Sequence, residues 1–173
     1  MSRINLLSQE AAPPEFQETF QQITQRGGRV LNLFKAMAHS PQVGLQFLRL
    51  GNAILLKGIV PPPLRELAIL RVGHLTGAIY EWTHHVPIAL RVGVRQAQID
   101  ALTDWERSQE FGETEKAILR YTDEETLKIR VSDETFSAVR DALGEEGVVE
   151  LTTTIGYYGM VCRILETLQV ELE

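Results

Sequence analysis

Apolar positions recur every three or four residues along nearly the whole chain, and the alternation typical of strands is almost absent. Glycines and proline-containing steps separate the periodic stretches, as expected for the ends of helices. The pattern predicts helices over residues 15–26, 30–38, 41–57, 64–76, 78–92, 97–102 and 113–128, another that begins at 132, and a last one over 146–170. We therefore expect an all-α fold in which most helices are antiparallel.

The stretch over residues 64–76 is apolar on nearly every side, which is typical of a buried helix. Glu66 and Arg71 interrupt this apolar surface. A buried acid needs a partner that compensates its charge. Arg71 is one candidate partner for Glu66, and His85, across the turn expected at Gly77, is the other. Structural pairing and catalysis are equally consistent with this position of Glu66.

The length of 173 residues suits one domain, and no linker or low-complexity stretch divides the chain. We predict a single domain over residues 1–173, with its core from about residue 28. The net charge of −6 comes from interspersed acids and bases without a basic run, which argues against nucleic-acid binding. No apolar stretch reaches the roughly 18 residues of a membrane span. The N-terminus lacks the apolar core of a signal peptide, so we expect a cytoplasmic protein.

The chain contains a single cysteine, Cys162. One thiol cannot form a disulfide within the chain, and no Cys-x-x-Cys pair is present. Any two-cysteine redox cycle would therefore need a partner chain. The sequence also lacks a His-Glu-x-x-His motif, and the adjacent His84 and His85 cannot share a helix face. We expect no metal and no cofactor.

Glu81 and His85 are four residues apart in the predicted helix 78–92, so they lie on one face. That face is mostly apolar, which predicts partial desolvation of both groups. Burial raises the pKa of a carboxyl group, whereas a neighbouring imidazolium lowers it. The pair is thus placed to exchange a proton near neutral pH. The alternative is a buried structural pair without a catalytic task. His84 points about 100° away and is expected to meet solvent or a neighbouring chain.

Two stretches of the chain resemble the carboxymuconolactone decarboxylase family. They are Arg65-Glu-Leu-Ala-Ile-Leu-Arg-Val-Gly-His-Leu-Thr-Gly and Tyr80-Glu-Trp-Thr-His-His-Val-Pro-Ile-Ala-Leu. Flanking pieces that begin at Gly28 and Gly156 are also similar to the family. The resemblance implies the all-helical fold of alkylhydroperoxidase D and a homo-oligomer, either a trimer or a hexamer.

The resemblance also assigns roles to individual positions. Alkylhydroperoxidase D members carry a Glu and a Cys-x-x-Cys-x-x-x-His motif, and decarboxylase members use the corresponding histidine without the cysteines. That histidine falls on His85 and the upstream glutamate on Glu66. The two cysteine positions are occupied by Ala78 and Glu81. Because both thiols are missing, the resemblance implies a peroxidase-like fold without the family's dithiol chemistry.

The combined expectation is a decarboxylase-type enzyme that acts on a small carboxylated lactone or a related enolisable acid. His85 would be the acid–base residue, with Glu81 orienting it and Glu66 supporting it. The residues expected to contact substrate are Arg71, Tyr80, Trp82 and Tyr157, with Arg71 as the counter-charge for a carboxylate. Tyr157, Tyr158 and Arg163 of the last predicted helix resemble pocket-lining groups, and the alternative, which the sequence favours for the two tyrosines, is a pair of core aromatics with a surface arginine. The alternatives are an alkylhydroperoxidase D-like peroxidase with another electron route, and a non-catalytic oligomer that binds a small ligand.

Overall fold

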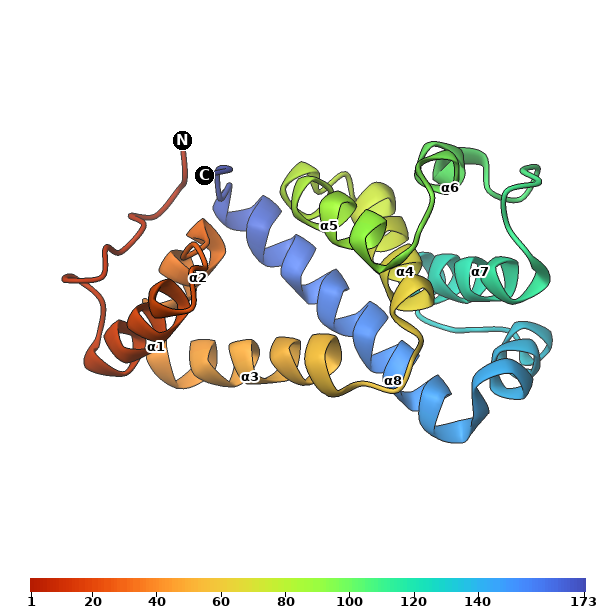
Figure 1. Cartoon of the computed structure of the whole chain (residues 1–173), viewed down its shortest axis with the longest axis horizontal. Helices are drawn as coiled ribbons and strands as arrows, with labels where there is room; N and C mark the ends of the chain where they lie inside the picture. The colour runs from red at the N-terminus through yellow and green to blue at the C-terminus, as the bar shows by residue number, and fades with distance from the viewer. The chain divides into compact units, whose positions relative to one another are not determined.

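The computed structural model describes residues 1–173 and contains helices without any strand (Figure 1). The helices are α1 (Pro14–Gln25), α2 (Asn32–Met37), α3 (Pro41–Lys57), α4 (Pro62–Thr76), α5 (Ile79–Val92), α6 (Gln96–Ala101), the short 3-10 helix η1 (Leu102–Asp104), α7 (Glu113–Lys128) and α8 (Asp133–Leu168). The all-α class expected from the hydrophobic pattern is confirmed, with boundaries that agree to within a few residues. None of these helices is both long enough and apolar enough to cross a membrane.

The chain packs as two compact units, of which the first comprises Met1–Leu56 together with Ile164–Glu173. Phe16 and Phe20 of α1 are buried in it and meet edge to face, with ring centroids 5.6 Å apart. The N-terminal segment is tied to the C-terminal segment by a backbone hydrogen bond in which Arg3 donates to Leu168 at 2.8 Å. The single domain expected from the sequence stays a prediction.

The second unit, Lys57–Arg163, is built around α4. All nine residues from Arg65 to Gly73 are buried, so the burial predicted for this stretch is confirmed. The helix ends at Gly77, which has φ of 69° and so adopts the left-handed conformation that glycine accepts most easily. The chain then turns directly into α5, and α5 and α7 both pack against α4 (Figure 1).

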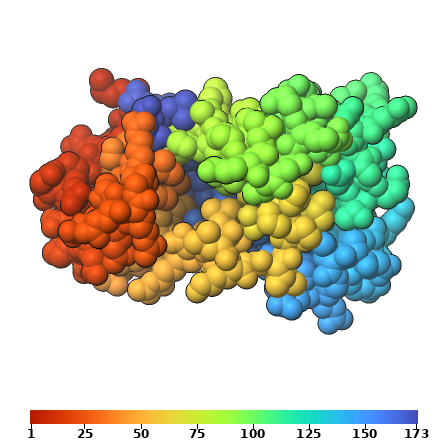
Figure 2. Space-filling view, in the orientation of Figure 1, coloured from red at the N-terminus to blue at the C-terminus, as the bar shows by residue number.

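The core of the second unit joins helices that are far apart in sequence. Its buried cluster includes Leu67 and Leu70 of α4, Ala89 of α5, Trp105 after η1 and Leu119 of α7. Figure 2 shows the side of this unit that carries α5 and α6, where the green atoms of both helices form one continuous surface. These contacts fix α4 and α5 side by side and thereby hold their polar side chains in register.

The last helix differs from the prediction in its connection. The sequence predicts one helix beginning at 132 and another over 146–170, whereas α8 runs from Asp133 to Leu168 with a break inside it. The break is at Gly144, whose φ of 71° and ψ of 176° lie in a region that only glycine adopts readily. The predicted boundary between these two helical segments is therefore present, and it consists of the single residue Gly144 (Figure 1).

Candidate functional site

The ring of His85 lies between two carboxylates that come from two helices. Its Nδ1 is 2.7 Å from Oε2 of Glu66 on α4, and its Nε2 is 3.0 Å from Oε1 of Glu81 on α5. Glu81 and His85 share one face of α5, and the turn at Gly77 places α4 alongside that face. The structure thus brings together the three residues that the sequence proposes as catalytic.

The carboxylate–imidazole–carboxylate group is almost completely shielded from solvent. The side chains of His85, Glu81 and Glu66 keep 7%, 5% and 0% of their exposure. Burial alone would lower the pKa of His85, but the hydrogen bonds and charges of Glu66 and Glu81 outweigh burial and raise the pKa from 6.5 to about 9. His85 is therefore an imidazolium at neutral pH, and each of its ring nitrogens donates to one carboxylate.

A second cation completes the charge balance of this buried group. Oε1 of Glu66 lies 3.5 Å from Nε of Arg65, whose side chain is also buried. Two carboxylates, one imidazolium and one guanidinium then sum to zero net charge. Buried ions are tolerated when they are paired in this way. The arrangement therefore keeps a titratable ring inside the fold without leaving an uncompensated charge.

Tyr158 of α8 contacts the imidazole directly. The rings of His85 and Tyr158 meet edge to face with centroids 4.9 Å apart, and Tyr157 packs against Tyr158 at 5.3 Å. Burial, and then the nearby charges of Glu81 and Glu66, raise the pKa of Tyr158 well above its usual value, so its hydroxyl stays neutral. The sequence placed Tyr157 rather than Tyr158 among the substrate contacts. Periodicity alone gives no signal for Tyr158, because its partner lies on a helix more than 70 residues away in sequence.

The two positions that match the cysteines of the peroxidase motif lie at the start of α5. Ala78 is fully buried and precedes the helix, and Glu81 lies in its first turn. A small cavity of about 160 Å³ at the α4–α5 turn is lined by Ala78, Gly73 and Trp82, among others. A Cβ atom on Gly73 would lie 3.7 Å from Cβ of Glu81, which is ordinary van der Waals contact. Neither of these two cysteine-matching positions, Ala78 and Glu81, carries a thiol in this chain.

Arg71 does not join this group, although the sequence offers it as a counter-charge for substrate. Its Nε and Nη2 donate to the two carboxylate oxygens of Asp123 on α7, at 2.6 and 2.9 Å, and its Nη1 donates to the carbonyl of Leu102 at 2.7 Å. Trp105 donates to the same carboxylate at 3.0 Å. Because its guanidinium group is hydrogen-bonded to Asp123 and Leu102, Arg71 links α4 to α7. We therefore remove it from the proposed substrate contacts.

We expect Arg71→Met to lower the free energy of unfolding by about 2 kcal/mol. Breaking a fully buried ion pair costs roughly 3–5 kcal/mol, and the loss here is smaller because Asp123 keeps 20% of its side-chain exposure. Urea denaturation measures the change, with Arg95→Met at an exposed ion pair as the matched control. Unchanged stability together with weakened substrate binding would return Arg71 to the substrate site.

The other expected substrate contacts are placed around α5. Tyr80 is buried and stacks on His84, with ring centroids 4.4 Å apart. Trp82 is half-buried, packs against the core cluster and faces His74 at 6.2 Å. Of the two, Trp82 lines the cavity at the α4–α5 turn. His84 points to another side of α5 than His85, in agreement with the helical spacing.

Comparisons with known proteins bear on the fold and the family. The chain is similar to a peroxidase-related protein with an alkylhydroperoxidase AhpD core from Ralstonia eutropha JMP134, with a TM-score of 0.85, 19% identity, and coverage of 99% of this chain and 92% of that one. It is also similar to a peroxidase-related protein from Silicibacter sp. TM1040, with a TM-score of 0.84, 14% identity, and coverage of 99% and 92%.

A third similar structure is a cysteine-to-alanine variant of the debrominase Bmp8 in complex with 2,3,4-tribromopyrrole. It has a TM-score of 0.79 and 22% identity, and the similarity covers 100% of this chain and 94% of that one. At these identities the solved structures show a shared fold. No curated protein matches the chain. The model of the carboxymuconolactone decarboxylase family matches residues 41–124, a range that includes all of α4 and α5. The expected resemblance is thereby confirmed, and residues 41–124 carry the pattern of the carboxymuconolactone decarboxylase family.

Proposed function

We propose that this protein is an acid–base enzyme that acts on a small carboxylated lactone or a related enolisable acid. The observation that carries the proposal is the buried imidazole ring of His85, held between the carboxylates of Glu66 and Glu81. Acid–base catalysis needs a group that can give up a proton and regain it in a fixed place. The family pattern over residues 41–124 supports the choice of substrate class.

In the proposed reaction, the bond between the lactone carbon and its carboxylate breaks and CO₂ leaves. The electron pair of that bond enters the conjugated lactone as an enolate. The imidazolium of His85 then gives a proton to the enolate carbon, and the neutral ring regains a proton from water. Glu81, whose side chain keeps 5% of its exposure, contacts the Nε2 end of the ring, and the fully buried Glu66 contacts the Nδ1 end. Both acids favour the imidazolium and so reset the site after each turnover.

The direct test is incubation of the purified protein with carboxymuconolactone, with CO₂ release and loss of the lactone's absorbance as readouts. A wider test follows exchange of solvent deuterium into a panel of enolisable carboxylic acids by NMR, since proton relocation needs no CO₂ loss. Catalysed turnover or exchange in either assay supports the proposal. Saturable binding of these compounds without either reaction would contradict it and favour a ligand-binding role.

We expect no efficient dithiol-dependent peroxidase activity. The thiol route needs an attacking thiolate and a resolving thiol. Ala78 and Glu81 occupy those positions here, and Cys162 is buried in α8 with 1% exposure. The measurement is consumption of cumene hydroperoxide with dithiothreitol as reductant, compared between the wild-type protein and Cys162→Ser. Robust turnover that survives this substitution would show that another electron route exists.

We also propose that the protein forms a homo-oligomer built from trimers, as the family resemblance implies. The chain exposes several large apolar side chains that a partner subunit would cover, among them Leu56, Ile79 and Val149. Light scattering coupled to size-exclusion chromatography measures the mass at micromolar concentration. A mass of 19.5 kDa, that of one chain, would contradict the proposal.

A further inference from the structure

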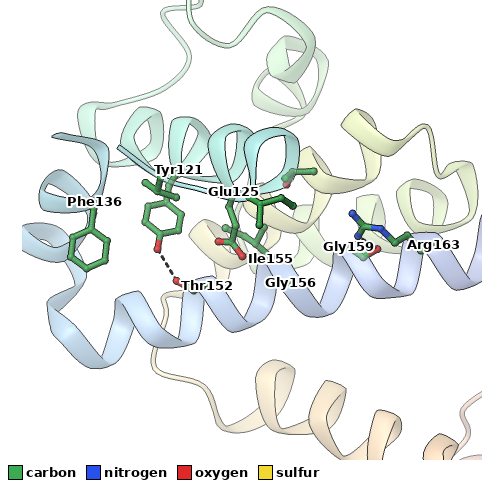
Figure 3. Close-up of a pocket in the computed structure, with 11 residues that line it drawn as sticks. Tyr121, Glu125, Phe136, Thr152, Ile155, Gly156, Gly159 and Arg163 are labelled. Carbon is green, nitrogen blue, oxygen red and sulfur yellow. Dashed lines mark hydrogen bonds between the residues drawn. The ribbon is translucent and has the colours of Figure 1, made fainter. Parts of the chain in front are cut away.

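A second hollow of the second unit lies between α7 and α8, away from the turn that joins α4 to α5 (Figure 3). Its volume of about 460 Å³ is in the range of pockets that bind small molecules. Phe136 and Tyr121 lie towards one end, Arg163 lies at the other, and Glu125 points into the space between them (Figure 3). Ile155 of α8 adds an apolar wall. The pocket thus combines an apolar end, a carboxylate and a guanidinium in a line.

The carboxylate of Glu125 lacks a partner inside the protein. Its Oε2 atom is buried and forms no hydrogen bond, and the hydroxyl of the adjacent Thr126 is likewise unsatisfied. Burial raises the pKa of Glu125 to about 7, as expected for an acid that no cation compensates. A buried polar atom without a partner is costly and is rare in folded proteins. A ligand that donates a charged hydrogen bond to Glu125 would remove that cost.

Two glycines of α8 lie beside the charged groups of Glu125 and Arg163. A Cβ atom on Gly156 would lie 3.8 Å from Oε1 of Glu125, and one on Gly159 would lie 3.0 Å from Nη1 of Arg163. Residues three apart on a helix have Cβ positions about 5–6 Å from each other. Arg163 donates one hydrogen bond to the carbonyl of Gly159, at 2.8 Å, and lines the same pocket as Glu125. The acid and the base therefore lie along the same side of the pocket, one beside Gly156 and the other beside Gly159 (Figure 3).

The rim of the pocket contains a strained residue. Ile129 ends α7 with φ of 63°, a left-handed conformation that is exceptional for a β-branched side chain. Glycine would relieve this strain, yet an isoleucine with 75% of its surface exposed lines the pocket instead. Strain that is kept at an exposed position is a sign of function rather than of packing. Ile129 extends the apolar wall towards the open side.

We propose that this pocket binds a small zwitterion with an apolar body, of which an α-amino acid with a large apolar side chain is the simplest example. The ligand's ammonium group would pair with Glu125 and its carboxylate with the remaining donors of Arg163. Its apolar body would lie against Phe136 and Ile155. Charge complementarity at two points fixes the orientation, and the apolar end selects large side chains over small ones. The site is independent of the proposed chemistry at His85.

Three matched probes test this proposal by isothermal titration calorimetry at pH 8, where Glu125 is ionised. L-phenylalanine carries both charges, 2-phenylethylamine carries only the ammonium, and 3-phenylpropanoate carries only the carboxylate. We expect L-phenylalanine to bind once per chain with a Kd below about 1 mM. Each single-charge probe should bind at least about tenfold more weakly, since it loses one charge-assisted contact. Glycine, which lacks the apolar body, should not bind measurably.

Variants assign each end of the ligand to its residue. Glu125→Gln should weaken L-phenylalanine and 2-phenylethylamine by about tenfold or more while leaving 3-phenylpropanoate unchanged. Arg163→Gln should show the opposite pattern between the two single-charge probes. Gly156→Leu should block all three by filling the pocket, and circular dichroism checks that this variant is folded. Glu146→Gln, an exposed acid on α8 outside the pocket, is the matched control.

Three results would overturn the proposal. The first is the absence of saturable binding by any of the three probes. The second is binding that neither Glu125→Gln nor Arg163→Gln alters, which would place the ligand elsewhere. The third is a loss of self-association in Gly156→Leu without binding of any probe, which would make this groove a contact between copies of the chain. None of these readouts depends on decarboxylation, so their outcome is separate from that of the proposed function.

Discussion

Replacing His85 by alanine should lower turnover of the carboxylated lactone by about 100-fold or more. His85 is the one imidazole that lies between two carboxylates, and alanine removes the group that carries the proton. A positioned acid–base group typically contributes 10²–10⁴ in rate. The measurement is kcat/KM for CO₂ release, or the rate of solvent deuterium exchange if the true substrate does not lose CO₂.

The matched controls separate chemistry from folding. His85→Gln keeps an amide that can donate to one carboxylate but cannot exchange a proton, so it should be as inactive as His85→Ala. His84→Ala removes the adjacent imidazole, which stacks on Tyr80 and faces another side of α5. It should retain most of the activity. All three variants are expected to remain folded by circular dichroism and urea denaturation.

The opposite pattern would identify the buried group as structural. In that case His85→Ala would unfold the protein, because Glu66 is fully buried and would lose its closest partner. Activity per folded molecule would persist, and His85→Gln would restore stability by replacing the hydrogen bond. The comparison of the two substitutions, in stability and in activity per folded molecule, therefore decides between a catalytic and a structural role.

The sequence predicts the local parts of this site well. Helical spacing places Glu81 and His85 on one face, and the glycine at 77 predicts the turn that brings Glu66 back towards them. These contacts form between residues of two consecutive helices. Over such short sequence separations, helical periodicity and the residues that end helices predict which side chains meet. For the same reason the all-α class and most helix boundaries follow from the pattern of apolar residues.

Long-range pairing is the part that the sequence does not predict. The sequence suggests Arg71 as a counter-charge for a substrate carboxylate, whereas its partner in the structure is Asp123, 52 residues away on α7. Asp123 looks like one of several acids on an amphipathic helix, so nothing local distinguishes it. The same holds for Tyr158, whose contact with His85 depends on how α8 packs. Periodicity gives the face of a helix but not the identity of its neighbour.

The contribution of His85 to the free energy of unfolding should fall by about 3 kcal/mol as the pH rises from 6.5 to 10. The pKa of His85 is about 9 in the folded state and close to 6.5 in the unfolded chain. Because the folded state binds this proton more tightly, the contribution is fully present below pH 6.5. It is lost as the pH rises through 9, when the ring gives up its proton between two carboxylates.

Glu81→Gln isolates this contribution from other groups that titrate at high pH. The variant keeps the helix and a side chain of the same size but removes one of the two charges that raise the pKa of His85. Its free energy of unfolding should therefore change less between pH 6.5 and 10 than that of the wild-type protein. Urea denaturation at several pH values gives both curves, and lysine and tyrosine titrations cancel in their difference.

A direct measurement of the protonation state of the His85 ring completes the test. The chain has four histidines, so ¹⁵N-labelled imidazole signals can be assigned with His85→Ala as the reference. At pH 7.5 both nitrogens of His85 should give the shifts of an imidazolium, whereas in Glu81→Gln the ring should lose its proton at a lower pH. A neutral His85 at pH 7.5 in the wild-type protein would show that one of the carboxylates holds the proton instead. The acid that protonates the enolate in the proposed reaction would then be Glu66 or Glu81, and the ring would only connect them.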